Sequence, residues 1–318
     1  MKTATHLPRL IATLVAGAAG AVFAFTGSAH AAATSSFQIS PPTANYAANP
    51  GVQQKGTIKV TNLTAVPLSV RVTKQNFVAK GEEGEIELVD DANPLYSLAP
   101  WFNFDAPQID IPALGTKELH YTVDIPAGAE PGGRYGSIVF NTIAPKLPSG
   151  QSGATVQQQI AGIVFQRING AANEKLQVES FAPDQSFSEF GPVTLLTRVK
   201  NTGSVHEKPT GTIVIKNMLG LTVDTFALSE HFIIPGAIRR LKNDWPAGGK
   251  HPILIGRYTA ELNATYGGGQ KLSAATSFTV FPWRVMLALL IALIILFIVF
   301  WRGRRRLARA GRILAGRE

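Results

Sequence analysis

The stretch Lys55–Val72, KGTIKVTNLTAVPLSVRV, indicates the fold class of the chain. Its two arms, Lys55–Thr61 and Leu68–Val72, alternate apolar with polar residues, which is typical of β-strands with one buried and one solvated face. The segment between them, Asn62–Pro67, consists of turn formers, and its proline stands where no ladder hydrogen bond is needed. The stretch therefore predicts two neighbouring strands joined by a turn.

The same two-residue period recurs along the rest of the chain. The further predicted strands are Thr116–Ile125, Arg134–Thr142, Val156–Ile168, Glu174–Phe181, Val193–Lys200, Thr210–Lys216, Val223–Leu228, Ala237–Leu241, Gly256–Tyr266 and Lys271–Phe281. No segment before Trp283 has a helical period. Many short strands separated by turns favour antiparallel sandwiches over a parallel sheet, so we predict an all-β fold.

An internal repeat divides these strands into two sets. Four motifs recur in the same order: Val60–Asn62, Ile111–Pro112, Pro126–Gly128 and Gly133–Tyr135 are answered by Val199–Asn201, Ile234–Pro235, Pro246–Gly248 and Gly256–Tyr258. Self-similarity of this kind indicates repeated structural units. We therefore predict two tandem immunoglobulin-like sandwiches, at residues 32–170 and 171–281, with the boundary at Asn169–Gly170.

After the last predicted strand the chain becomes apolar without interruption. Residues 283–301 hold no acidic residue, and from Val285 to Trp301 there is neither a charge nor a proline, which predicts a transmembrane helix. The segment 302–318 carries seven arginines and one glutamate. Because basic flanks are retained in the cytoplasm, the sequence predicts a single-pass protein of the cell membrane with a cytoplasmic C-terminal tail and extracytoplasmic sandwiches.

The first 31 residues have the three parts of a secretory signal peptide. Lys2 and Arg9 precede an apolar segment, and Ala29–Ala31 places small residues at the positions that a signal peptidase reads. We predict cleavage after Ala31, with an uncleaved N-terminal anchor as the alternative.

The charge and cysteine content exclude several classes of function. The signal segment, Arg284 and the basic tail account for the whole net charge of +9, so the segment between them is neutral and nucleic acid is not predicted as a partner. The chain has no cysteine, which excludes thiolate chemistry and Cys-ligated metals. About 250 external residues are enough to bury cores without disulfides.

No catalytic, cofactor or metal site is predicted. The histidines show no HExxH spacing, and neither a GxSxG elbow nor a phosphate-binding glycine loop is present. The acidic run Gly81–Asp91 offers clustered oxygen ligands for calcium, but its spacing fits no EF-hand loop. A solvated hairpin whose charges protect an edge strand is the favoured interpretation of this run.

An aromatic loop supplies the candidate ligand contacts. Tyr96, Trp101, Phe102 and Phe104 lie close together in sequence, and sugar rings pack their apolar faces on aromatic rings. The alternative is that Trp101 fills the core of the sandwich.

The order of these features resembles the WxL-interacting cell-surface proteins of Gram-positive bacteria. The resemblance is carried by the signal segment, Phe37–Pro41, Ile58–Pro67, Trp101, Gly132–Gly136, the second sandwich, the membrane helix and the arginine-rich tail. It implies a first domain similar to the peptidoglycan-binding domains of that family and a second similar to its host-ligand-binding domains.

Together these features predict a membrane-anchored, non-enzymatic surface protein that recognises cell-wall peptidoglycan or another envelope protein through its sandwiches. The alternative is a structural or accessory subunit of an envelope complex. Small residues that allow close helix packing would support the accessory role, and Ala288 and Ala292 form such a pair.

Overall fold

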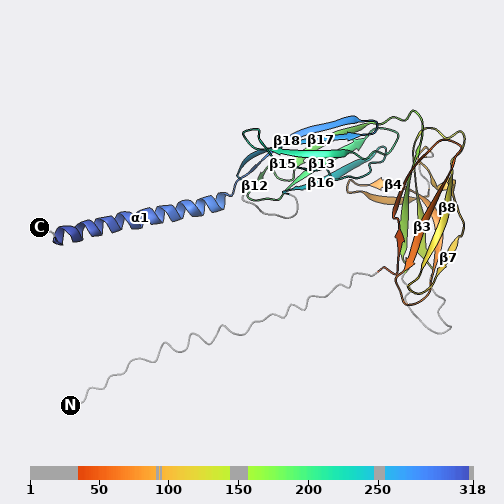
Figure 1. The fold of residues 1–318 in the computed structure, drawn as a ribbon, viewed down its shortest axis with the longest axis horizontal. Coiled ribbons are helices and arrows are strands. Elements are labelled where there is room, and N and C mark those ends of the chain that lie inside the picture. The colour runs from red at the N-terminus through yellow and green to blue at the C-terminus, as the bar shows by residue number, and fades with distance from the viewer. Residues whose placement is uncertain (1–34, 91–92, 94, 144–156, 247–254, 315–318) are drawn as a thin grey trace, which may run out of the picture. The chain divides into compact units, whose positions relative to one another are not determined.

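The described strands form four sheets, followed by one C-terminal helix (Figure 1). The computed structural model describes residues 35–90, 93, 95–143, 157–246 and 255–314, so the predicted signal peptide, residues 1–31, lies outside the described residues. The predicted fold class is confirmed: the chain is mostly β, with sandwich-like sheets and an apolar helix after the last strand.

The first sandwich contains the strands up to Ile168. These are β1 (Phe37–Ser40), β2 (Thr43–Ala48), β3 (Gln53–Asn62), β4 (Leu68–Lys80), β5 (Glu85–Val89), β6 (Phe102–Phe104), β7 (Gln108–Ile111), β8 (Thr116–Asp124), β9 (Gly132–Thr142) and β10 (Gln159–Ile168), with a short 3-10 helix at Ala99–Trp101. One sheet has the order β1-β3-β8-β6 and the other β2-β10-β9-β4-β5, with β7 paired to β4.

The second sandwich contains the strands from Leu176 onward. These are β11 (Leu176–Pro183), β12 (Phe187–Ser188), β13 (Val193–Asn201), β14 (Thr210–Lys216), β15 (Thr222–Ala227), β16 (Ile238–Trp245), β17 (Gly256–Tyr266) and β18 (Gln270–Val280). One sheet has the order β11-β13-β16 and the other β12-β18-β17-β14-β15. Among the described strands, no strand of one sandwich pairs with a strand of the other.

The predicted boundary at Gly170 falls between these two sets of strands. Contacts group Ser36–Glu318 as one unit, so the division into two domains stays a prediction of the sequence. In each sandwich one short strand pairs in parallel, β2 with β10 and β12 with β18, and the other described strand pairs are antiparallel, as predicted.

Alternation along the strands gives each sandwich its own core. Strand β13 is the clearest case, because every second residue from Val193 to Asn201 is buried. The first core contains Phe37, Leu119 and Phe140, and the second contains Leu195, Ile213 and Phe278. A third, smaller cluster of Phe77, Tyr135 and Phe165 lies apart from both.

Helix α1 (Trp283–Leu314) begins three residues after β18 ends. The segment Trp283–Arg304 contains an 18-residue window with a mean hydropathy of 2.8 and is long and apolar enough to cross a membrane. Its 22 residues span about 33 Å, close to the thickness of a bilayer core. The helix continues beyond the predicted end at Trp301, since the arginine-, alanine- and leucine-rich sequence that follows has high helix propensity.

Candidate binding groove between the sandwiches

The third apolar cluster joins the two sandwiches. Phe77 of β4, Tyr135 of β9 and Phe165 of β10 come from the first sandwich, and His206 and Phe232 come from loops of the second. The ring centroid of Phe165 lies 5.0 Å from that of Phe232 and 5.1 Å from that of His206. Aromatic pairs at such distances stabilise an interface beyond the area they bury. We call the region around this cluster the junction.

Two hydrogen bonds cross the junction beside the rings. The distance between His206 Nε2 and Asn45 Oδ1 of β2 is 2.9 Å, and the amide of Gly133 donates to the carbonyl of Ser204 at 2.8 Å. His206 is only 6% exposed. Burial, together with the charge of Arg167, lowers the pKa of His206 to about 4, so the ring is neutral at physiological pH.

Glycine allows the chain to approach this closely at Gly132 and Gly133. Gly132 has a φ of 138°, and a Cβ there would lie 3.0 Å from the Ser204 carbonyl oxygen. A Cβ at Gly133 would lie 1.9 Å from the hydroxyl of Tyr135. Both positions therefore exclude larger residues, which gives the predicted Gly133–Tyr135 motif a structural role in the junction.

The turn between β4 and β5 makes ion pairs with the second sandwich. Glu82 accepts two hydrogen bonds from Arg198 of β13, at 2.8 Å and 2.5 Å, and one from Arg240 of β16 at 3.1 Å. Glu83 lies 2.8 Å from Lys242 Nζ. The hydrogen bond from Arg198 lowers the pKa of Glu82, and that from Lys242 lowers the pKa of Glu83.

These contacts correct the interpretation of the acidic run as a solvated hairpin. Strand β5 does lie at the edge of its sheet, as predicted, but Glu82 and Glu83 bind basic side chains of the second sandwich. Among the described residues, no group of three or more histidines, aspartates or glutamates is placed to hold a metal ion.

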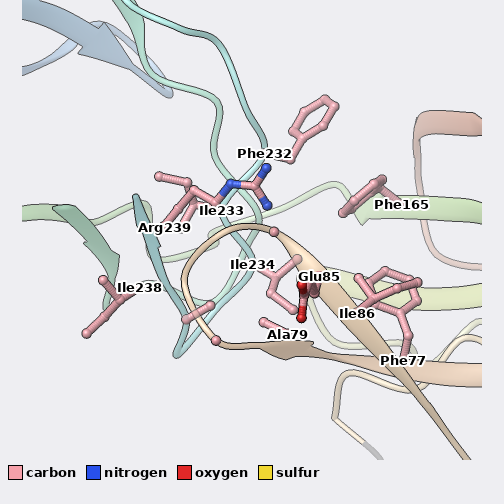
Figure 2. A pocket seen from close by; sticks show the side chains of 13 residues that line it. Phe77, Ala79, Glu85, Ile86, Phe165, Phe232, Ile233, Ile234, Ile238 and Arg239 are labelled. Atoms are coloured by element: carbon pink, nitrogen blue, oxygen red, sulfur yellow. The ribbon is translucent and has the colours of Figure 1, made fainter. Parts of the chain in front are cut away.

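Next to the aromatic cluster is a small cavity of about 80 Å³. Figure 2 shows its lining, to which the β4–β5 hairpin contributes Ala79 and Ile86 and the second sandwich contributes Phe232 and Ile234. The guanidinium of Arg239 closes one side, packed where Gly84 has no side chain. Burial lowers the pKa of Arg239.

A larger groove adjoins this cavity on the surface, with a volume of about 320 Å³. We call it the junction groove. Its lining residues come from both sandwiches: Phe77, Val78, Ala79, Asn93, Tyr96, Tyr135, Ile234, Pro235, Gly236 and Ala237. Most are apolar or aromatic, with the amide of Asn93 and two phenols as polar groups. Sites that bind ligands are commonly of this size and composition.

The structure separates the four aromatic residues nominated from the sequence. Tyr96 lines the junction groove, whereas Trp101 packs on the edge of the first core with the Arg134 guanidinium 5.6 Å from its ring centroid. Phe102 is 1% exposed and lies inside that core, so its nomination as a ligand contact is wrong in this structure. The cause is the turn at Ala99–Trp101, which directs Phe102 inward.

Phe104 stays at the surface, half-buried. It borders a shallow hollow of about 420 Å³ on the β3–β8–β6 face, away from the junction. The hollow is rich in polar side chains, among them Lys55, Thr57, Asn103 and His120. Tyr96 and Phe104 therefore belong to two different surfaces of the first sandwich.

Sequence reasoning did not find the residues that make the junction. His206 and Phe232 were not nominated, and Glu82 was considered only within the acidic run, because the partners of His206 and Glu82 lie 161 and 116 residues away in the chain. A signal was present in Ile234–Pro235, which was recognised only as a member of the repeat.

No family model and no curated protein matches the sequence. Among solved structures the chain is similar to the YadV chaperone, with 12% identity, a TM-score of 0.38 and coverage of 77% of this chain and 100% of that chain. It is also similar to the class 5 fimbriae chaperone CfaA, with 12% identity, a TM-score of 0.38 and coverage of 76% and 99%. For the E. coli chaperone DraB the identity is 14%, the TM-score 0.37 and the coverage 75% and 95%. A likeness this distant assigns no function to the chain.

Proposed function

We propose that this protein is a membrane-anchored, non-enzymatic surface protein that binds an apolar segment of another envelope protein in the junction groove. The observation that supports the proposal is the composition of the groove, in which residues of both sandwiches line one cavity that is mostly apolar. Helix α1 supplies the anchor, and its arginine-rich end lies on the cytoplasmic side by the positive-inside rule.

The lining favours a protein segment over a sugar polymer in this groove. Ile234, Pro235 and Val78 offer dispersion contacts but no hydrogen bonds from their side chains. A polysaccharide would lose water from its hydroxyl groups and find few partners there, which is unfavourable. An extended peptide with apolar side chains would bury apolar area on both sandwiches at once.

Crosslinking in intact cells tests the proposal. A photo-reactive amino acid replaces Val78 in the groove, and Val66, an exposed valine in the β3–β4 turn, provides the matched position. We expect a protein adduct at position 78 whose crosslinked peptide is apolar, and no adduct at position 66. Filling the groove by Ala79→Trp should abolish the adduct, and Val66→Trp should not. An adduct at position 78 that survives Ala79→Trp would contradict the proposal.

A second candidate function is the binding of cell-wall polymer by the hollow beside Phe104. The polar side chains around one aromatic ring, Asn103 and His120 among them, favour it, because sugars need both stacking and hydrogen bonds. The resemblance to WxL-interacting proteins supports the same ligand.

A pull-down of the full-length protein in detergent with insoluble peptidoglycan tests this candidate. The double variant Asn103→Ala, His120→Ala should lose binding, whereas Lys117→Ala, at an exposed position near the start of β8, should keep it. Equal binding by both variants would place any polymer site elsewhere. The accessory-subunit alternative differs in that the crosslinks would map to α1 around Ala288 and Ala292 instead of the groove.

A further inference from the structure

The second sandwich exposes large apolar side chains at one end. In the turn between β14 and β15, Met218 is 75% and Leu219 is 77% exposed. With them we group Leu221 of the same turn, Ile255 before β17, and Phe187 and Phe190 around β12, all of them exposed. We call these six residues the apolar rim.

The turn that carries Met218 and Leu219 is held in one conformation by hydrogen bonds. The side chain of Asn217 accepts hydrogen bonds from the amides of Leu219 and Leu221, both at 3.0 Å, and Gly220 has a φ of 76°. The backbone geometry thus holds the two side chains outward, although an apolar surface exposed to water is unfavourable. Such a turn indicates that its apolar side chains contact another surface when the protein functions.

Strand register places the whole rim at the end where helix α1 begins. Lys216 pairs with Thr259, so the chain after Lys216 runs toward Gly256, and Gly256 pairs with Val280, three residues before Trp283. The Met218 sulfur lies 4.0 Å from the position of a Cβ on Gly256. Ser188 likewise pairs with Val280, which brings Phe187 and Phe190 to the same end.

The link between sandwich and helix is short and tied down. Only Phe281 and Pro282 separate β18 from α1, and the amide of Phe281 donates to the Ser188 carbonyl at 2.9 Å. Arg284 forms an ion pair with Glu189 at 3.5 Å, so the positive charge of Arg284 at the start of the helix is neutralised. Since the apolar span begins at Trp283, only two residues separate this end of the sandwich from the segment that is apolar enough to cross a membrane.

We propose that the apolar rim inserts into the interfacial layer of the membrane around the start of α1, so that the second sandwich docks on lipid. The inference rests on the proposed membrane anchorage of α1. Aromatic and apolar side chains are favoured at the boundary between headgroups and acyl chains, where Phe187, Phe190 and Trp283 would lie. The rim thereby gives the sandwich a second attachment to the same bilayer.

Depth measurements on the full-length protein in lipid nanodiscs test this docking. Because the chain has no cysteine, a single introduced cysteine carries one fluorophore; lipids with a shallow nitroxide quench labels in the interface, and lipids with a deep nitroxide quench labels near the bilayer centre, such as one at position 291. The rim variant is Leu219→Cys. Ile291→Cys reports on the helix, and Lys271→Cys reports on the far end of β18, roughly 30 Å from Val280 at 3.3 Å per residue.

We expect several-fold stronger quenching at positions 219 and 291 than at 271. Quenching at 291 alone would overturn the rim proposal and leave the anchor intact, whereas no quenching at any site would overturn both. Equal quenching at 271 and 219 would also overturn it, because the sandwich would then lie along the membrane. A shielded but unquenched label at 219 would indicate a second copy or another protein on the rim and would overturn lipid docking.

Introducing a charge into the rim gives an independent test of its insertion into lipid. Leu221→Asp should reduce the quenching of a label at position 219, since a carboxylate is costly to insert into lipid. Val66→Asp, at an exposed valine of the first sandwich, should leave it unchanged. Undiminished quenching in the Leu221→Asp variant would contradict insertion of this turn.

Discussion

His206 of the second sandwich and Asn45 of the first are joined by a hydrogen bond of 2.9 Å inside the junction. The ring of His206 packs against both Phe165 and Phe232 and is 6% exposed, so it has lost nearly all of its contact with water. A charged imidazole would therefore be unstable there, and the junction is most stable when the histidine is neutral.

This arrangement predicts acid sensitivity. The pKa of His206 falls from 6.5 when unfolded to about 4 when folded, so its contribution is complete above pH 6.5 and is lost as pH falls from 6.5 to about 4. The full loss corresponds to about 3 kcal/mol. Unfolding free energies measured across this range should show the slope, and His206→Gln should reduce it; burial also lowers the pKa of His231, which contributes in the same direction. His120→Gln, at an exposed histidine, should keep it; an unchanged slope in His206→Gln would contradict the assignment.

The ion pairs of the β4–β5 turn predict a separate effect at lower pH. The pKa values of Glu82 and Glu83 are lowered, so their contribution is present above the ordinary value of 4.5 and is lost as pH falls through their folded pKa. A double-mutant cycle of Glu82→Ala with Arg198→Ala should give a favourable coupling energy, measured by denaturant unfolding, because two charge-assisted hydrogen bonds join the pair. The cycle of Glu87→Ala with Lys80→Ala, an exposed pair 3.9 Å apart, should give less than about 0.5 kcal/mol.

The repeat predicts matched losses of stability in the two sandwiches. Asn62 and Asn201 are 1% and 0% exposed, and each donates from its side-chain amide to carbonyls of the turn that follows and of a distant segment. Either substitution by alanine should cost about 2–3 kcal/mol, since buried carbonyls lose their donor. Asn263→Ala, at an exposed strand position, should change the unfolding free energy by less than about 0.5 kcal/mol. Clearly unequal losses would show that the two asparagines have different roles.

Substitution of Trp101 or Phe102 should lower the stability of the first sandwich and should not act through a ligand contact. Phe102→Ala should destabilise by about 3–5 kcal/mol, because it empties a core position. Trp101→Ala should also destabilise, through the lost core contacts and the lost contact with Arg134. Denaturant unfolding of both variants checks this. A Phe102→Ala variant of unchanged stability would contradict the core placement.

Local patterns were sufficient for most of the fold. The alternation at 210–216 and 256–266 predicted β14 and β17 with their observed bounds, because both strands have one face on a core. The repeat also located Asn62 and Asn201, whose amides reach Pro112 and Ile233, next to the segments that the repeat had matched. Short edge strands such as β2 and β6 were not predicted, since the inward positions of β2 (TANYAA) are mostly alanine and β6 has only three residues.

The junction could not be predicted from the sequence, for a physical reason. Glu82 resembles a solvated charge and Phe232 an ordinary loop residue until the fold brings them to Arg198 and Phe165. The same limit applies to Phe102, whose burial follows from the turn before it.

The lengths of β17 and β18 determine how far the groove end of the second sandwich lies from the start of α1. Val280 lies next to the helix. At the opposite end of the sandwich, the Tyr266 hydroxyl donates a hydrogen bond to the Leu176 carbonyl. The Asn201 carbonyl accepts one from the amide of Gly236, close to the groove residue Ile234. Along eleven residues of strand this separation is about 36 Å. With α1 as the proposed membrane anchor, the second sandwich would act as a spacer of about this height between the bilayer and the groove, and a partner anchored in the same bilayer would need an arm of comparable length to occupy it.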